Sequence, residues 1–228
     1  MRKLYDLCTA DADVRLSPPC WLVKFALKHK GLDFETVPLR FTDKDRHPDP
    51  DYGLFPVLEE EDGSLVRDSA AIIAYLEEAY PDNPLWRTDG ERAASAVIQG
   101  VVGGHVFPPL IRPMFLRVHN TLAPADQAYF RETREARIGM TLEDFAADQT
   151  SGPKIEAALK TLSAPLEAHA FFGGAAPNIS DYIVAAPLMW QRTTTSDALY
   201  ETPAPLAVWF ERILDLYDGF GRSAPRAA

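Results

Sequence analysis

The sequence predicts two unlike parts: a small α/β domain over residues 1–82 and an all-helical domain over residues 88–228. The first part shows a strand–helix–strand pattern within about forty residues, then a hairpin pattern and another helix. After residue 88 the apolar spacing is helical, and no convincing strand pattern follows. Together these observations indicate a mixed sheet with helices against it, followed by a helical bundle.

The first unit begins with a short strand at residues 3–8, a polar loop and a helix that starts at Ser17. Ser17 is a favoured N-cap, and Pro18 and Pro19 suit first-turn positions whose N–H groups need no intrahelical partner. A second strand follows at residues 34–39. A unit of this length predicts two parallel strands joined by a right-handed crossover.

Residues 40–53 are rich in Pro and Asp and predict an irregular loop or a short helix. The stretch 54–81 then predicts a βαβ-ββα order for the domain, with a hairpin around an Asp-Gly turn and a helix starting at Asp68-Ser69. Pro56 cannot donate to a ladder, so it belongs at the start or edge of its strand, and its peptide bond is a candidate for the cis form. The N–H groups at the start of the helix beside it suit a small anionic ligand.

The second part predicts five helical segments: about 90–118, 124–148, 154–171, one from Asn178, and 205–217. The first of these contains Gly103-Gly104 and three prolines, so it should bend or break. The last ten residues predict a loose tail. We expect the domain boundary in the linker near 81–88.

Composition narrows the classes of function. A net charge of −10 argues against a nucleic-acid surface, which needs clustered Lys and Arg. We find no run of about 18 apolar residues and an N-terminus too polar for a signal peptide, so we expect neither a membrane span nor export. Two cysteines, Cys8 and Cys20, fit a reducing compartment, and the expected location is the cytoplasm. The spacing of the histidines at 105, 119 and 169 suggests no metal site.

Three short motifs occur in this frame: FPVL at 55–58, DS at 68–69 and NISD at 178–181. With the predicted order of elements, they resemble the cytosolic glutathione transferase family over the whole chain. The resemblance implies a thioredoxin-like first domain, an all-α second domain, transferase activity, glutathione as co-substrate and a homodimer. Within the family, residues 16–31 most resemble bacterial β-etherase-like and related fungal glutathione transferases, which implies a role in detoxification or aryl-ether cleavage.

An enzyme of this kind must keep the sulfur of glutathione as thiolate. A free thiol with a pKa of about 8.5 is only a few per cent ionised at neutral pH. Lowering that pKa by about two units requires about 2.7 kcal/mol of differential stabilisation, which a hydroxyl donor at a helix N-terminus can supply. The resemblance implies a catalytic Ser or Cys at the first strand–helix junction, and we assign this role to Ser17. The alternative is that Ser17 is only an N-cap.

The segment from Ser17 to Cys20 also looks like a thioredoxin-type C-x-x-C motif whose first cysteine has become serine. This argues against a dithiol oxidoreductase. Cys8, at the end of the first strand, is an alternative thiol, although a buried structural cysteine is the better interpretation.

The resemblance also implies the rest of the glutathione site. Val57, next to Pro56, would exchange backbone hydrogen bonds with the cysteinyl unit, and Asp68 and Ser69 would hold the γ-glutamyl end. The alternative for this pair is simple helix capping. The glycyl carboxylate needs a cation, for which the loop offers Lys44, Arg46 and His47. Leu54 stands where the family often has a basic residue, which leaves this contact open.

An apolar substrate pocket is the last expected feature. Phe107, Met114 and Phe115 are candidates to line it, against core packing as the default, and Phe220 is a weaker candidate. We therefore expect a glutathione transferase acting on an apolar, aromatic electrophile. The alternatives are a non-catalytic glutathione- or ligand-binding protein of the same fold, and a glutathione-dependent isomerase or reductase.

Overall fold

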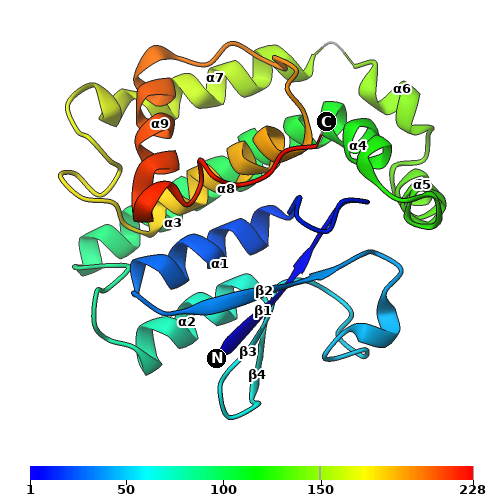
Figure 1. Ribbon diagram of the computed structural model, residues 1–228. Helices are drawn as coiled ribbons and strands as arrows, with labels where there is room; N and C mark the ends of the chain where they lie inside the picture. Colours follow the sequence, from blue (N-terminus) through cyan, green and yellow to red (C-terminus); the bar gives the residue numbers. More distant parts are fainter. Residues whose placement is uncertain (149, 228) are drawn as a thin grey trace.

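A four-stranded mixed sheet forms the base of the first domain (Figure 1). The computed structural model describes residues 1–148 and 150–227. The strands lie in the order β2-β1-β3-β4, with β1 parallel to β2 and antiparallel to β3, which pairs antiparallel with β4. Their bounds are β1 Arg2–Leu7, β2 Phe34–Leu39, β3 Val57–Glu59 and β4 Leu65–Arg67. The predicted α/β fold class and parallel first unit are confirmed.

Helix α1 (Pro18–His29) lies between this sheet and the helical domain (Figure 1). It begins as predicted, with Ser17 as N-cap and prolines in the first turn. Its buried residues are apolar except for Lys24, which pairs with the buried Asp6 at 2.8 Å. Phe25 stacks on Tyr182 of helix α8 (Ile179–Thr194) with ring centroids 5.5 Å apart. The two domains therefore share one continuous core around α1.

The stretch 54–81 follows the predicted order of elements. The peptide bond between Phe55 and Pro56 is cis, and Pro56 directly precedes β3. Gly63 takes a φ of +86° in the hairpin turn, a conformation that glycine adopts without a steric penalty. Helix α2 (Ser69–Ala79) follows with Asp68 as N-cap.

The first helical segment of the second domain bends without breaking. Helix α3 (Asp89–Val101) passes through a π-helical turn, η2 (Val102–Val106), into α4 (Phe107–Thr121). Gly103 and Gly104 lie within that turn, so the irregular residues widen the helix locally. The prolines at 108 and 109 come directly after this π-helical turn, so the widened turn accommodates two residues that have no N–H to donate.

The predicted helix over 124–148 is wrong as a single element. Helix α5 (Pro124–Ile138) ends at Gly139, whose φ of +75° makes it a left-handed C-cap, and a short α6 (Leu142–Ala146) follows. The predicted segment 154–171 is likewise α7 (Ser151–Ser163) followed by the 3-10 turn η3 (Ala164–Glu167). The sequence pattern missed these ends because apolar residues continue at helical spacing across both of them, from Ile138 to Leu142 and from Leu162 to Leu166.

The last two helices confirm the predicted starts. Helix α8 (Ile179–Thr194) has Asn178 as N-cap in a complete capping box with Asp181, and α9 spans Ala204–Gly219. The final residues, however, are not the loose tail that we expected. The Ala227 N–H donates to the Thr193 carbonyl at 2.8 Å, and Arg192 donates to backbone carbonyls of this segment.

One continuous helix, Asp89–Thr121, has the length and apolar composition that could cross a membrane. We did not expect such a segment, and length and composition alone are weak evidence of one. Its outer face carries small or apolar exposed residues, which include Ala93, Ala96, Val97 and Gly100. These residues give α3 an exposed surface of small and apolar side chains.

Candidate active site

A cavity of about 420 Å³ lies where the two domains meet. Three segments of the first domain line it: the N-terminal ends of α1 and α2 and the loop that follows β2. Helix α5 of the second domain provides the opposite wall, above that loop (Figure 1). Two helix N-termini at one cavity make it a favourable place for an anion.

Ser17 lies at this cavity, and its side chain is almost fully buried. Its Oγ accepts a hydrogen bond from the Cys20 backbone N–H at 3.4 Å, the bond of an N-cap. This bond uses an acceptor lone pair, so the Ser17 O–H keeps its proton to donate, either to the Cys20 thiol beside it or to a ligand in the cavity. A sulfur atom placed there would meet both a hydroxyl donor and the positive end of the α1 dipole.

Asp68 and Ser69 lie at the same cavity, at the start of α2. The Asp68 Oδ1 accepts from the N–H groups of Ala70 at 2.8 Å and Ala71 at 3.3 Å. Asp68 has a φ of +70°, an unusual conformation for a residue other than glycine that is found disproportionately at functional sites. Helix capping and ligand binding can coexist here, because Oδ2 takes no part in the cap.

Pro56 and Val57 lie behind the cavity wall. Both side chains are buried, and Val57 pairs with Tyr5 of β1 and Arg67 of β4. The residues of this segment that line the cavity are Leu54 and Phe55. Pro56 nevertheless connects this segment to the start of α2, because its carbonyl accepts a hydrogen bond from the Asp68 N–H at 3.3 Å.

The loop after β2 brings cationic side chains to the cavity, and they are not equivalent. His47 is buried with both ring nitrogens engaged: Nδ1 accepts from the Asp49 N–H at 3.0 Å, so Nε2 donates to the Leu54 carbonyl at 2.9 Å. Arg46 pairs with Asp43 and does not line the cavity. Lys44 is exposed at the cavity, and among the described residues no carboxylate lies within ion-pair distance of its Nζ.

Sequence reasoning missed the wall formed by α5. Tyr129 and Arg134 line the cavity from this helix, and Arg40 and Phe41 line it from the loop below. The guanidinium carbon of Arg134 lies 5.3 Å from the centroid of the Phe41 ring, so the two domains meet at this contact. One signal was available in the sequence: Arg134 has no acidic residue three or four positions away on its helix.

The residues predicted to line an apolar substrate pocket lie outside this cavity. Phe107 stacks on Trp190 with centroids 5.5 Å apart, Met114 is fully buried, and Phe115 packs against Phe130. None of the three lines the cavity, because the inner face of α4 is used for the helical core. Phe220 packs on α1, with its ring 5.9 Å from that of Phe25.

The two cysteines are unsuited to act as the reactive thiol. Both are free, buried and absent from the cavity lining. Burial raises the pKa of Cys8 to about 11 and raises that of Cys20 well above its ordinary value. Among residues 1–148 and 150–227, no group of three or more His, Cys, Asp or Glu side chains is arranged to hold a metal ion.

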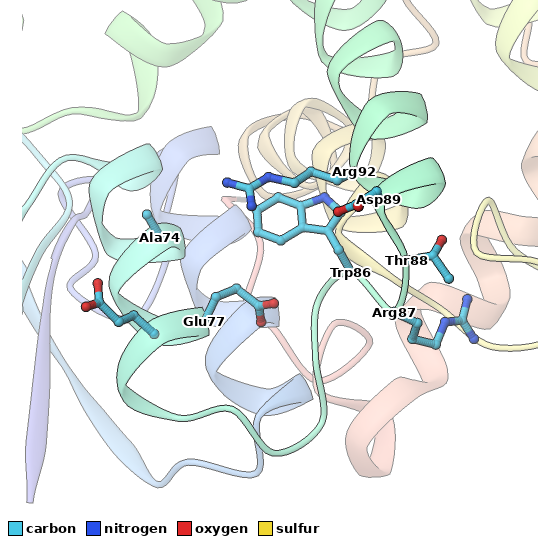
Figure 2. A pocket seen from close by; sticks show the side chains of 8 residues that line it. Ala74, Glu77, Trp86, Arg87, Thr88, Asp89 and Arg92 are labelled. Atoms are coloured by element: carbon cyan, nitrogen blue, oxygen red, sulfur yellow. The ribbon is translucent and has the colours of Figure 1, made fainter.

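A second hollow of about 690 Å³ lies between α2 and the start of α3 (Figure 2). Figure 2 shows Arg92 beside the indole of Trp86, and its guanidinium carbon lies 5.2 Å from the ring centroid. The carboxylate of Glu77 on the α2 side is held by Lys30 and by the Leu85 N–H. Although this hollow is larger, it contains neither of the helix ends that carry Ser17 and Asp68, so the first cavity is the better candidate.

Solved structures of known proteins share this architecture. A glutathione transferase from Phanerochaete chrysosporium is 24% identical, covers 96% of this chain and 93% of its own, and superposes with a TM-score of 0.74. A glutathione S-transferase from Ceriporiopsis subvermispora, solved in complex with glutathione, is 24% identical with a TM-score of 0.70, covering 93% of this chain and 86% of its own. These likenesses establish the fold.

Sequence relatives and family models agree with that fold. Maleylacetoacetate isomerase from Pseudomonas aeruginosa is 35% identical over 100 residues, which span 40% of this chain but only 47% of the relative. A glutathione S-transferase from Hyoscyamus muticus is 24% identical over 87% of this chain and 90% of its own. The N-terminal domain model of glutathione S-transferases matches residues 12–84 and the C-terminal domain model matches residues 93–202. The chain belongs to the glutathione S-transferase family.

Proposed function

We propose that this chain is a glutathione transferase that activates the thiol of its co-substrate at Ser17. The observation that carries the proposal is the placement of Ser17, Asp68 and Ser69 at one cavity, each at or beside a helix N-terminus. The Ser17 O–H would donate to the sulfur, which favours the thiolate over the thiol. The thiolate would then attack an electrophilic carbon, forming a C–S bond while the leaving group departs with the bonding electrons.

The remaining parts of glutathione have candidate partners in the same cavity. The γ-glutamyl carboxylate suits the hydroxyl and the backbone N–H of Ser69 at the start of α2, and its ammonium suits the outer oxygen of Asp68. The backbone of the segment from Phe55 to Val57 would supply hydrogen bonds to the cysteinyl unit, with Phe55 lining the cavity and Val57 directly behind it. We assign the glycyl carboxylate to Lys44, because His47 already uses both ring nitrogens on backbone groups.

A thermal-shift experiment tests binding before any turnover is measured. Glutathione at millimolar concentration should raise the melting temperature, since it would bind only the folded state. Ser17→Ala should keep most of this shift, because the hydroxyl acts on the sulfur and not on the peptide ends. The absence of a shift in the unmodified chain would contradict the proposal. A shift without turnover would favour a non-catalytic binding protein of the same fold.

A glutathione-dependent isomerase is the second candidate, and one observation favours it. One relative, 35% identical over 100 residues, is named maleylacetoacetate isomerase. Three plant relatives are named glutathione S-transferase Z1, glutathione S-transferase Z2 and glutathione S-transferase zeta class. An isomerase would add the thiolate to an activated double bond and expel it again, so that glutathione is not consumed. Product analysis separates the two: a transferase accumulates a stable conjugate.

Aryl-ether cleavage is a narrower form of the same proposal and rests on the resemblance of residues 16–31 alone. The reaction would release a phenolate in place of a halide. A reductase of the dithiol type fits less well, because Ser17 replaces the nucleophilic cysteine of a C-x-x-C motif and Cys20 is buried. Assays with a β-aryl ether and with a disulfide distinguish these possibilities.

We further propose that the chain acts as a cytoplasmic homodimer. The exposed small and apolar residues along α3, among them Val97 with 69% of its surface accessible, would pack against the same helix of a second copy. Light scattering should give twice the chain mass, and Val97→Glu should shift it toward the monomer. A monomer at all concentrations would contradict the assignment.

A further inference from the structure

Arg131 and Arg134 lie about one turn apart on helix α5, but their side chains have different surroundings. Arg131 forms ion pairs with Glu135 and Glu143, at 2.7 and 2.8 Å. Arg134 lines the cavity, and within the described part of the chain no carboxylate lies within ion-pair distance of it. Its side chain donates a hydrogen bond to the neighbouring Thr133 Oγ1 at 2.9 Å.

The position of the Arg134 guanidinium is set by two aromatic rings. Its central carbon lies 4.6 Å from the ring centroid of Phe130 and 5.3 Å from that of Phe41. Such contacts hold a planar cation in place but do not neutralise it. Partial burial lowers the pKa of Arg134, so the charged form is held at a cost that an anion in the cavity would offset.

In the proposed function no charged group of glutathione is assigned to Arg134, and the acidic residues of the cavity have other partners. Of the described residues that line it, Arg40, Lys44 and Arg134 are cationic and Asp43 and Asp68 are anionic. Asp43 already accepts from the Arg40 N–H and from Arg46, and Asp68 caps α2. In the proposed function, Lys44 and the start of α2 hold the two carboxylates of glutathione. Arg134 lies on the opposite wall, where the second substrate must enter.

We infer that Arg134 selects electrophiles that carry a carboxylate or similar anionic group beside a flat apolar body. Phe41 and Tyr129 supply the apolar surfaces next to it, and a guanidinium binds a carboxylate through two parallel hydrogen bonds. This inference rests on the proposed function, because it names the substrate class of the same site. It makes Arg134 a substrate-binding residue with no part in the thiol chemistry.

A matched pair of aryl chlorides tests the inference. The probes are 1-chloro-2,4-dinitrobenzene, which is neutral, and 4-chloro-3,5-dinitrobenzoate, which carries the carboxylate. In both reactions a C–S bond forms, the C–Cl bond breaks, and chloride leaves with the electron pair. For each probe, kcat/KM of Arg134→Gln is divided by kcat/KM of the unmodified chain. Comparing these two ratios cancels the difference in intrinsic reactivity between the two probes.

Arg134→Gln should lower kcat/KM for the carboxylated probe by about tenfold more than for the neutral probe, mainly through KM. Arg134→Lys should recover part of the loss, since it keeps the charge but not the planar fork. Arg137→Gln is the matched control, because Arg137 is exposed on the same helix and does not line the cavity. That control should leave both probes unaffected.

Equal losses with the two probes would overturn the inference, since Arg134 would then act through packing alone. A raised KM for glutathione in Arg134→Gln would also overturn it, by placing Arg134 in the glutathione subsite. If the unmodified chain turns over neither probe, the proposed function fails separately. Calorimetry then decides the inference by measuring the affinity for the two glutathione conjugates, prepared without enzyme. Arg134→Gln must weaken binding of the carboxylated conjugate and leave binding of the neutral conjugate unchanged.

Discussion

Asp126 and Thr42 join the two walls of the cavity. The Asp126 Oδ1 accepts from both the backbone N–H and the hydroxyl of Thr42, each at 2.9 Å, although the two residues are 84 positions apart. Asp126 is almost fully buried at the start of α5, whereas Thr42 lies in the loop that carries Phe41 and Lys44. This pair therefore fixes how the loop faces Tyr129 and Arg134.

Removing that acceptor should loosen the cavity as well as the fold. We expect Asp126→Ala to lower the free energy of unfolding by about 1–3 kcal/mol, because two donors lose their partner. Asp126→Asn keeps an oxygen that can accept and should cost less. Urea denaturation measures both variants. A double-mutant cycle with Thr42→Val isolates the hydroxyl bond, because the Thr42 N–H still donates to Asp126 in that variant. Additive losses in that cycle would show that the hydroxyl bond contributes nothing to the coupling of the two walls.

Asp68 should contribute to glutathione binding beyond its role as a helix cap. Asp68→Asn retains an oxygen for the Ala70 and Ala71 N–H groups but loses the charge that would meet the γ-glutamyl ammonium. We expect about tenfold weaker glutathione binding with little loss of stability. Calorimetry and thermal unfolding of the same variant check the two effects. Unchanged affinity would show that Asp68 acts only as the N-cap of α2.

Cys8 gives a pH-dependent prediction whose sign follows from burial. Burial raises its pKa to about 11 in the folded chain, from the ordinary value of 9.0 for an exposed thiol. Between these values the unfolded chain loses the proton that the folded chain keeps, so this thiol contributes stability below pH 9 that is lost as the pH rises toward 11.

The same burial should protect Cys8 from modification. Iodoacetamide at pH 8 should alkylate it rapidly only in denaturant, as mass spectrometry can show. The other buried thiol, Cys20, serves as an internal control, because it should behave in the same way. Fast alkylation of native Cys8 would return it to consideration as a reactive thiol.

Features with local causes could be predicted from the sequence. The N-cap at Ser17 and the capping box at Asn178 act within one helical turn, and Pro56 constrains its own peptide bond, so each leaves a readable pattern. Together with the order of elements, these were enough to predict the fold class and to select Ser17, Asp68 and Ser69, which the structure places at one cavity.

The other end of the cavity depends on contacts between distant residues. Apolar content alone pointed to Phe107 and Phe115, but which aromatic residues face the core depends on how α4 packs. Tyr129 and Arg134 reach the cavity because the Asp126–Thr42 contact orients α5 over the loop. The breaks at Gly139 and after Ser163 were missed for a related reason, since apolar spacing continues across them.

The ionisation of bound glutathione tests the central claim most directly. Ultraviolet difference absorbance of the thiolate, followed against pH, gives the pKa of the bound thiol in the unmodified chain and in Ser17→Ala. The account predicts a pKa about two units below that of free glutathione in the unmodified chain, and a value near that of free glutathione in Ser17→Ala. An equal pKa in both proteins would contradict the role of Ser17.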